Sequence, residues 1–320
     1  SSRRLQRSKR VRKVMREKSK RSMPKTAVKE APTIFSYYGG KVTIERKKWG
    51  ESFRYRRIWG EKEGSLLFAT HATKNLDKSR ALLPWAVDLV CTHITSNLNA
   101  DMFHKDEIFM LVQEARGKPE EAKVKGGTTG DAIHTFAHDF ALATLDKTKP
   151  FPSVDHLDPE KDDEHRKILN GVNAFLDWYN SNKVEFVAME KLVYYNSLLA
   201  GDTKPDEPVI EFAGILDLLA RVNGQLGVFD YKTGKAIYSD QRYQNAGYYK
   251  AYNSDPSNEK AVFAGILNFG KETGELIKGE YSASEVERDF EYGFKGLYLV
   301  TVREKELEAE REALKKEKAI

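Results

Sequence analysis

The dipeptide Asn223-Gly224, set between two alternating apolar runs, constrains the fold of this chain more than any other feature. Asn and Gly both tolerate positive φ, so the pair predicts a β-hairpin with a two-residue type I′ turn. Partners across such a hairpin have residue numbers with a constant sum, which Val222 opposite Gln225 sets at 447. Asp217 and Asp230 have the same sum, so their carboxylates are expected to stand opposite each other on one face.

Lys232 lies two residues beyond Asp230 and is therefore expected on the same face. Two carboxylates about 5 Å apart on strands of Ile, Leu, Val and Phe repel each other by about 1 to 4 kcal/mol, so something positive must offset the repulsion. Lys232 supplies one charge, and paired oxygen ligands suit a hard divalent cation, Mg²⁺ or Mn²⁺. Such a site is suited to hydrolysing phosphodiesters. The alternative is an ordinary hairpin with a solvent-facing row of Asp, Asp and Lys. That alternative would account for any one of these residues alone, but a metal site is favoured when all three share one face of an apolar hairpin.

Charge is distributed unevenly along the chain. Residues 1–30 hold 13 Lys or Arg and two acids, a net of +11, whereas the other 290 residues hold 40 bases and 46 acids, a net of −6. The basic segment has no sustained apolar period and is interpreted as a disordered or conditionally helical arm that contacts nucleic acid. Its Arg- and Ser-rich composition also fits an organelle transit peptide. We expect a cytoplasmic protein, with an organelle as the alternative.

Composition excludes several classes of protein and of site. With 40% hydrophobic residues the chain can bury a core, and no apolar run reaches the roughly 18 to 20 residues that cross a bilayer. The single cysteine, Cys91, excludes an intramolecular disulfide, a Cys-based zinc site and a cysteine-ligated iron–sulfur cluster. Cys91 lies in the apolar run 85–94 and is predicted to be buried.

Apolar periodicity predicts an α/β (α+β) order of elements with a central mixed β-sheet flanked by helices. The segment from Leu82 to Leu145 is predicted to be helical, with Pro84 at a first helical position and a third helix capped by Thr128 or Thr129. Ser282 and Glu285 have the spacing of a capping box that opens a charged C-terminal helix. The remaining expectations are short strands over 33–70, a loop over 149–159, a helix over 163–179, strands over 184–195, 212–222 and 225–233, a helix over 240–252, and a strand pair flanking 271–274.

Several short motifs together match a known family. Gly214-Ile215-Leu216-Asp217 and, after 12 residues, Asp230-Tyr231-Lys232-Thr233-Gly234 resemble the core of the PD-(D/E)XK nuclease superfamily, specifically its RecB-like branch. The segment 130–134 (GDAIH) looks like the upstream G-x-x-x-H element of that branch, and 244–248 (QNAGY) looks like its Q-x-x-x-Y element. The segment 81–87 (ALLPWAV) resembles phage and mobile-element members. The resemblance covers about residues 80–250 and implies a restriction-endonuclease-like core.

The resemblance also implies roles for individual residues. His134 would bind the metal, and Tyr231 would supply its backbone carbonyl to it while its side chain lies in the core. Glu190 sits where some members place a further acidic ligand, although strand alternation would put it on an apolar face with Phe186, Ala188 and Leu192. Gln244 and Tyr248, an i, i+4 pair, would contact DNA or order the lysine. His138 shares a helix face with His134 and is expected to be structural or close to the substrate.

Two charged segments allow alternative interpretations. The stretch 47–59 interleaves bases with aromatic residues, which is typical of a nucleic-acid surface, and Arg54 and Arg56 are its candidate DNA contacts. A hairpin with a core face of Trp49, Phe53 and Tyr55 fits equally well. The C-terminal helix is interpreted as a solvated face, with a partner-protein surface as the alternative.

The expected organisation is a basic arm (1–30), an N-terminal strand and helical region (31–125), the nuclease core (126–281) and the charged C-terminal helix (282–320). The expected function is a divalent-metal-dependent DNA nuclease, an exonuclease acting on DNA ends in recombination, repair or replication. The alternatives are a non-catalytic DNA-binding or assembly protein that retains the fold, and a restriction-type endonuclease.

Overall fold

The computed structural model describes residues 32–49, 52–59, 62–76, 78–98 and 104–317, so the basic arm lies outside the described residues. The described residues divide between two compact units, each described separately below. The smaller unit is built on a four-stranded sheet in the order β1-β2-β3-β4. Its strands are β1 (Thr33–Tyr37), β2 (Val42–Trp49), β3 (Ser52–Trp59) and β4 (Lys62–Ser65), although residues 36–42 belong to the larger unit.

The larger unit holds a six-stranded mixed sheet in the order β10-β9-β8-β7-β5, with β6 paired to β7. Antiparallel pairing joins β6 to β7, β7 to β8 and β9 to β10, whereas β8 and β9 run parallel, as do β5 and β7. The central mixed sheet expected from the sequence is confirmed. Its strands are β5 (Leu67–Phe68), β6 (Val184–Asn196), β7 (Glu211–Val222), β8 (Gln225–Lys232), β9 (Phe263–Phe269) and β10 (Leu276–Ser282).

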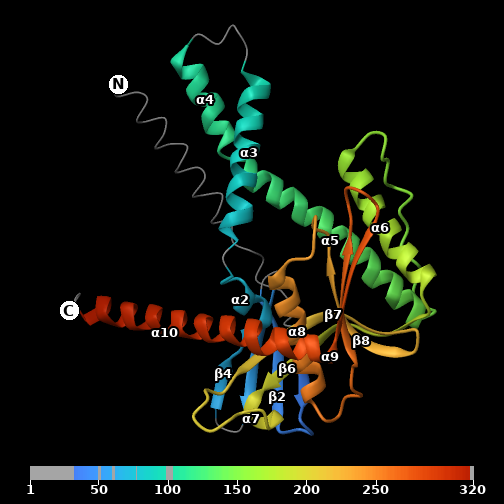
Figure 1. The fold of residues 1–320 in the computed structure, drawn as a ribbon, viewed down its shortest axis with the longest axis vertical. Coiled ribbons are helices and arrows are strands. Elements are labelled where there is room, and N and C mark those ends of the chain that lie inside the picture. The colour runs from blue at the N-terminus through green and yellow to red at the C-terminus, as the bar shows by residue number, and fades with distance from the viewer. Residues whose placement is uncertain (1–31, 50–51, 60–61, 77, 99–103, 318–320) are drawn as a thin grey trace, which may run out of the picture. The chain divides into compact units, whose positions relative to one another are not determined.

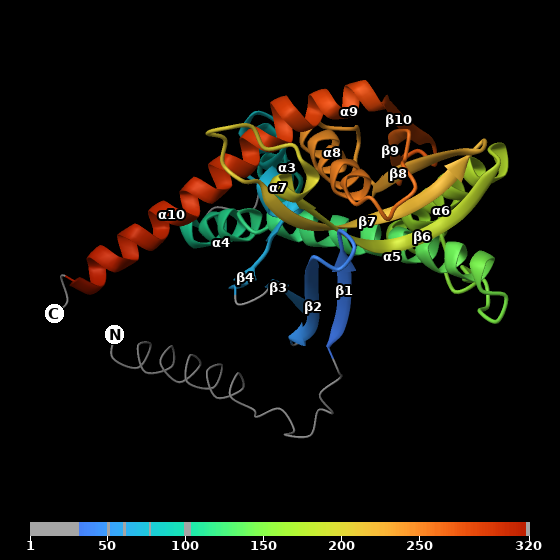
Figure 2. The same ribbon diagram turned by 90° about the horizontal axis from the view of Figure 1, so that it is seen from below.

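Helices cover both faces of this sheet (Figures 1 and 2). One core cluster joins strand side chains to α5 and α6 through Ile133, Phe175 and Trp178. The other joins them to α2, α8 and the C-terminal helices through Ala72, Tyr248 and other buried residues. The helices are α2 (Ala69–Thr73), α3 (Ser79–Asn97), α4 (Lys105–Ala115), α5 (Lys118–Leu145), α6 (Asp163–Ser181), α7 (Ser197–Ala200), α8 (Ser239–Ser254), α9 (Ala283–Asp289), the π-helical segment η1 (Phe290–Phe294) and α10 (Lys295–Glu317).

The sequence located most elements correctly, and the capping box of Ser282 and Glu285 is confirmed at the start of α9. The predicted starts of two helices were wrong. Pro84 lies inside α3 rather than at its first turn, and Thr128 and Thr129 lie in the middle of α5, which begins at Lys118. The start of α5 has its own signals, because a proline follows the first residue and Glu120 and Glu121 stand in the first turn, where the helix dipole favours acids.

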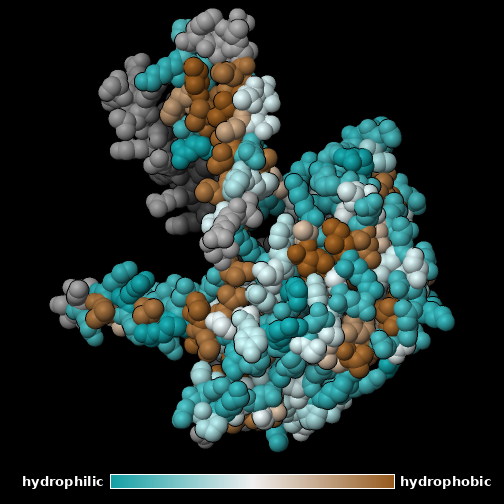
Figure 3. Space-filling model, viewed as in Figure 1, coloured by the Kyte–Doolittle hydropathy of each residue, from teal (hydrophilic) through white to brown (hydrophobic). Residues whose placement is uncertain are grey.

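The helices α3 and α4 expose apolar side chains (Figure 3). Leu83 on α3 is 64% exposed, and Met110 on α4 is 66% exposed. Cys91 on α3 is also exposed, so the prediction of a buried cysteine was wrong. The apolar run that suggested burial lies on a helix that the described part of the chain covers incompletely. No helix among the described residues is both long and apolar enough to cross a membrane.

Candidate functional site

The β7–β8 hairpin has the predicted register. Its antiparallel ladder runs from Val222 opposite Gln225 to Leu218 opposite Phe229. The turn residues Asn223 and Gly224 have φ values of +52° and +85°, as a type I′ turn requires. Asp217 and Asp230 come directly after the last pair of this ladder.

The ladder ends because β7 changes partner at this point. One edge of β7 pairs with β6 along its length, while the other pairs first with β5 at residues 212–213 and then with β8 at 218–222. Asp217 lies at the fork between β5 and β8. Its carboxylate accepts a hydrogen bond from the backbone N–H of Tyr231 at 2.7 Å, so a side chain takes the place of a strand partner. The backbone of the neighbouring strand therefore holds this carboxylate in place.

Beside the fork, the buried Asp230 forms an ion pair with the half-buried Lys232. Asp230 is 1% exposed, and burial, together with the nearby Asp217 carboxylate, raises its pKa to about 7, although Lys232 opposes the shift. Its Oδ2 atom receives no aligned hydrogen bond and contacts the ammonium only as an ion pair. Lys232 Nζ also donates to the backbone carbonyl of Tyr231 at 3.1 Å. Burial likewise raises the pKa of Asp217.

Glu190 extends the acidic pair into a row across three strands. In the β6–β7 ladder Met189 faces Leu218 and Lys191 faces Leu216, which puts Glu190 opposite Asp217. The expectation that Glu190 would lie on an apolar face was wrong, for two structural reasons. The register shifts by one residue between Phe186 and Ala188, and Glu190 itself has φ of +45°, so simple alternation fails here. Its exposed side chain lines the same pocket as Asp217.

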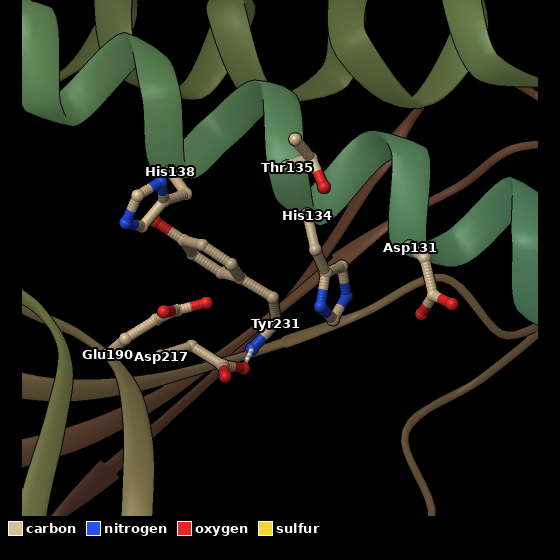
Figure 4. Close-up of a pocket in the computed structure, with 7 residues that line it drawn as sticks. All are labelled: Asp131, His134, Thr135, His138, Glu190, Asp217 and Tyr231. Carbon is tan, nitrogen blue, oxygen red and sulfur yellow. Dashed lines mark hydrogen bonds between the residues drawn. The ribbon is translucent and has the colours of Figure 1, made fainter. Parts of the chain in front are cut away.

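The helix α5 forms the opposite wall of this pocket, and Figure 4 shows its side chains projecting toward the strands. The pocket has a volume of about 390 Å³ and is lined by Asp131, His134, Thr135, His138, Glu190, Asp217 and Tyr231. Gly130 permits the close approach of α5, because a Cβ atom there would lie 2.9 Å from Oγ1 of Thr233. Thus the glycine of the G-x-x-x-H segment packs directly against the threonine that follows Lys232.

The surroundings of His134 favour the neutral form of its imidazole ring. Burial, followed by the positive charge of Lys232, lowers its pKa from the ordinary value, although Asp230 opposes the shift. Its ring packs edge-on against Tyr231, with ring centroids 5.7 Å apart. The Tyr231 side chain lies in the core, as expected from strand alternation. Metal-binding histidines are neutral, so this environment suits ligation. His138 lines the same pocket, and its Nδ1 lies 2.9 Å from the Asp139 carboxylate.

The helix α8 packs against the hairpin through Tyr248. The amide of Gln244 donates a hydrogen bond to the Tyr248 hydroxyl at 2.6 Å, so the i, i+4 pair forms. Tyr248 is 2% exposed, and its ring occupies the space over Gly214, where a Cβ atom would lie 2.5 Å from it. This contact explains why glycine precedes the Ile-Leu-Asp sequence. Because Tyr248 is buried, it orders Gln244 and does not present a stacking surface.

The donor atoms of the site fit a hard divalent cation. The three acids of the row supply oxygen ligands, and the unaligned Oδ2 of Asp230 is a buried acceptor that a cation would satisfy. Within the described residues, however, no group of three His, Cys, Asp or Glu side chains already converges as a metal cluster. Small side-chain adjustments would therefore have to accompany binding, and release of Asp230 from Lys232 is the first of them.

Sequence reasoning did not identify Asp131 and Thr135, which also line the pocket. Their signal was present, because positions 131, 134, 135 and 138 follow the i, i+3, i+4, i+7 spacing of one helix face. Arg54 and Arg56 belong to the smaller unit, where both are exposed on β3. Arg56 lies 3.7 Å from the Glu45 carboxylate on β2, within ion-pair distance.

Comparison with known proteins identifies one family. The model of the PD-(D/E)XK nuclease superfamily matches residues 108–317, about two thirds of the chain. The match begins within α4 and ends with α10, so it includes β7, β8 and the helices α5 and α8 that pack against them. A search of curated proteins found no match.

Proposed function

The chain belongs to the PD-(D/E)XK nuclease superfamily, and on this premise we propose that it is a divalent-metal-dependent DNA nuclease. The observation that carries the proposal is the proximity of Asp217, Asp230 and Lys232 at the end of the β7–β8 ladder. A buried and a half-buried carboxylate, both with raised pKa values, beside a half-buried ammonium are unfavourable in a merely structural role. Asp217 and His134, whose pKa values are both shifted, also line the pocket, and such groups mark a functional site.

Five residues would hold the metal. Asp217 and Asp230 are the central ligands, with His134, Glu190 and the backbone carbonyl of Tyr231 completing the set. Members of this superfamily generally use divalent metals, and we propose Mg²⁺ or Mn²⁺ without an iron–sulfur cluster. When bound, the ion polarises a phosphoryl oxygen and lowers the pKa of a coordinated water.

The protein itself would position the reactants for in-line hydrolysis. Lys232 holds the attacking water and stabilises the negative charge that develops on the phosphoryl oxygens. Gln244, ordered by Tyr248, contacts the DNA backbone. Arg54 and Arg56 on the smaller unit add sequence-independent phosphate contacts.

Finer assignments extend the same proposal. The motif pattern favours the RecB-like branch, and within it phage or mobile-element members, which points to an exonuclease acting on DNA ends during recombination, repair or replication. The exposed helix α10 offers a surface for a partner protein. We propose a cytoplasmic location, or an organelle if the basic arm is a transit peptide. A restriction-type endonuclease would cut circular DNA, and a non-catalytic binding protein would cut none.

The decisive experiment compares cleavage of labelled linear, nicked and circular DNA with and without Mg²⁺. We expect linear DNA to be degraded only with the metal, and Lys232→Ala to abolish cleavage. The matched control is Lys235→Ala, because Lys235 is an exposed lysine in the loop that follows. Equal cleavage by wild type and Lys232→Ala would refute the proposed chemistry.

Deletion of residues 1–30 should weaken DNA binding but retain cleavage, whereas the non-catalytic alternative predicts loss of all function.

A further inference from the structure

Asn268 on β9 is a buried amide without a hydrogen-bond partner. It is 0% exposed, and neither its Nδ2 nor its Oδ1 atom forms a hydrogen bond with any residue that the structure describes. Leaving a buried amide unsatisfied is destabilising. An apolar residue of similar size would avoid that cost, so stability alone does not explain an asparagine at this position.

Asn268 lies beside the proposed catalytic lysine. In the parallel β8–β9 ladder, Lys232 pairs with Asn268 and Asp230 pairs with Ile266. Paired residues of neighbouring strands project from the same face about 5 Å apart. On the other side of β9, Asn268 pairs with Ile277 of β10, which offers no polar group. Among the cross-strand neighbours of Asn268, Lys232 is therefore the one with a polar side chain.

Binding of a metal would remove both present partners of Lys232. Its ammonium contacts the Asp230 carboxylate and donates to the Tyr231 carbonyl, and both groups belong to the proposed ligand set. A divalent cation on those oxygens would repel the ammonium and compete for its acceptors. Because the Lys232 side chain is only 20% exposed, water would replace these acceptors incompletely, and another oxygen within reach would stabilise the ammonium.

We propose that Asn268 is a positioning residue whose side-chain oxygen receives the Lys232 ammonium when a divalent cation binds Asp230. This inference rests on the proposed function and deepens it. The unsatisfied amide of the metal-free protein becomes a partner of the lysine in the metal-bound protein. Asn268 thereby keeps Lys232 beside the phosphate while the carboxylate is released to the metal.

The matched pair Asn268→Val and Asn268→Thr tests this role, because valine and threonine have the same shape and only threonine retains an oxygen acceptor. Binding of Mg²⁺ to the full chain is measured by calorimetry without DNA. We expect Asn268→Val to bind Mg²⁺ about tenfold more weakly than Asn268→Thr, because only threonine retains an oxygen that can accept a hydrogen bond from the ammonium. On DNA, Asn268→Val should lower kcat with KM unchanged.

Thermal unfolding of the metal-free chain separates positioning from a structural role. We expect Asn268→Val to unfold at the same or a higher Tm than wild type, because it removes an unsatisfied amide. The control is Asn245→Leu on α8, which should lower Tm, because Asn245 is also buried but its Nδ2 donates to the Gly265 carbonyl at 2.8 Å.

Three results would overturn the inference: equal Mg²⁺ affinity in the Val and Thr variants, a lower Tm for metal-free Asn268→Val, or a wild-type chain that binds no Mg²⁺. Its failure can be distinguished from failure of the proposed function. If the two variants differ in Mg²⁺ affinity but wild type cleaves no DNA, only the nuclease proposal fails. If wild type cleaves DNA and the variants behave alike, only the role of Asn268 fails.

Discussion

At the scale of single residues, the proposed metal chemistry depends on the buried carboxyl of Asp230. Its pKa is raised to about 7, first by burial and then by Asp217. The carboxyl is therefore protonated below about pH 7 in the metal-free protein, and a cation binds its deprotonated form.

We expect Mg²⁺ affinity and cleavage to rise as pH increases from 6 to 8 and to fall as the carboxyl is protonated below about 7. Calorimetry in buffers of different ionisation enthalpy would measure the proton that Asp230 releases on metal binding, which should diminish at pH 8. Proton release that stays constant from pH 6 to 8 would contradict the assignment.

Gly214 provides a second test at this scale. A methyl group there would lie 2.5 Å from the buried ring of Tyr248, so Gly214→Ala should lower the free energy of unfolding by about 1 to 3 kcal/mol through overpacking. Gly127→Ala is the control, because a Cβ atom at that helical position meets nothing within 4 Å. It should raise stability by roughly 0.5 to 1 kcal/mol. Denaturant unfolding of both variants measures the difference. A Gly214→Ala variant as stable as Gly127→Ala would show that the Tyr248 ring moves aside at little cost.

Residues could be predicted from the sequence where local rules determine their positions. The placement of Asp217 and Asp230 directly beyond the last β7–β8 pair follows from the turn at Asn223-Gly224, because a two-residue hairpin has one register. The unsatisfied state of Asn268 could not be predicted, because it depends on the parallel pairing of β8 with β9 and on its pairing with the apolar Ile277 of β10.

At the scale of elements, β6 shows where periodicity fails. Its bulge near Val187 and the positive φ of Glu190 are backbone irregularities that alternation in the sequence does not reveal. Similarly, the glycines and threonines of 126–129 resembled a helix start, yet α5 continues through them. Packing against α6 and the strand ends outweighs the weak local preference of these residues.

The strain at Glu190 predicts an inverted order of stability. Both Glu190→Gly and Glu190→Ala remove the carboxylate, but only glycine adopts φ of +45° without steric cost. We expect the glycine variant to be more stable than the alanine variant by about 1 kcal/mol, which is the reverse of the usual order in a strand. Thermal unfolding of the two variants checks this, and an alanine variant of equal or greater stability would show that β6 relaxes to regular geometry.

At the scale of the whole molecule, bases are concentrated in segments outside the acidic site. The β2–β3 hairpin (residues 42–59) carries six bases and two acids, and its Lys47 pairs across the strands with Arg54. The site itself is rich in carboxylates, so electrostatic attraction of DNA has to come from elsewhere in the chain.

We expect the double variant Arg54→Gln, Arg56→Gln to weaken DNA binding at low salt and to reduce the slope of log K against log salt by about 2 units on duplex DNA. The control pair is Arg303→Gln, Lys161→Gln, which removes the same charge at positions distant in sequence from this hairpin. Fluorescence anisotropy over a salt series would measure the slopes. Equal slopes for the two double variants would remove the β2–β3 hairpin from the DNA-binding surface.

The hydrogen bond from the Tyr231 amide to Asp217 has a spectroscopic consequence. An amide proton donated to a carboxylate resonates far downfield, and a cation that withdraws charge from that carboxylate would shift the signal back upfield. One backbone resonance, in the strand that carries Asp230 and Lys232, would thus report occupancy of the site in solution. It could be followed during a titration without any substrate, and it would distinguish ions that reach the fork from ions that bind elsewhere on the surface.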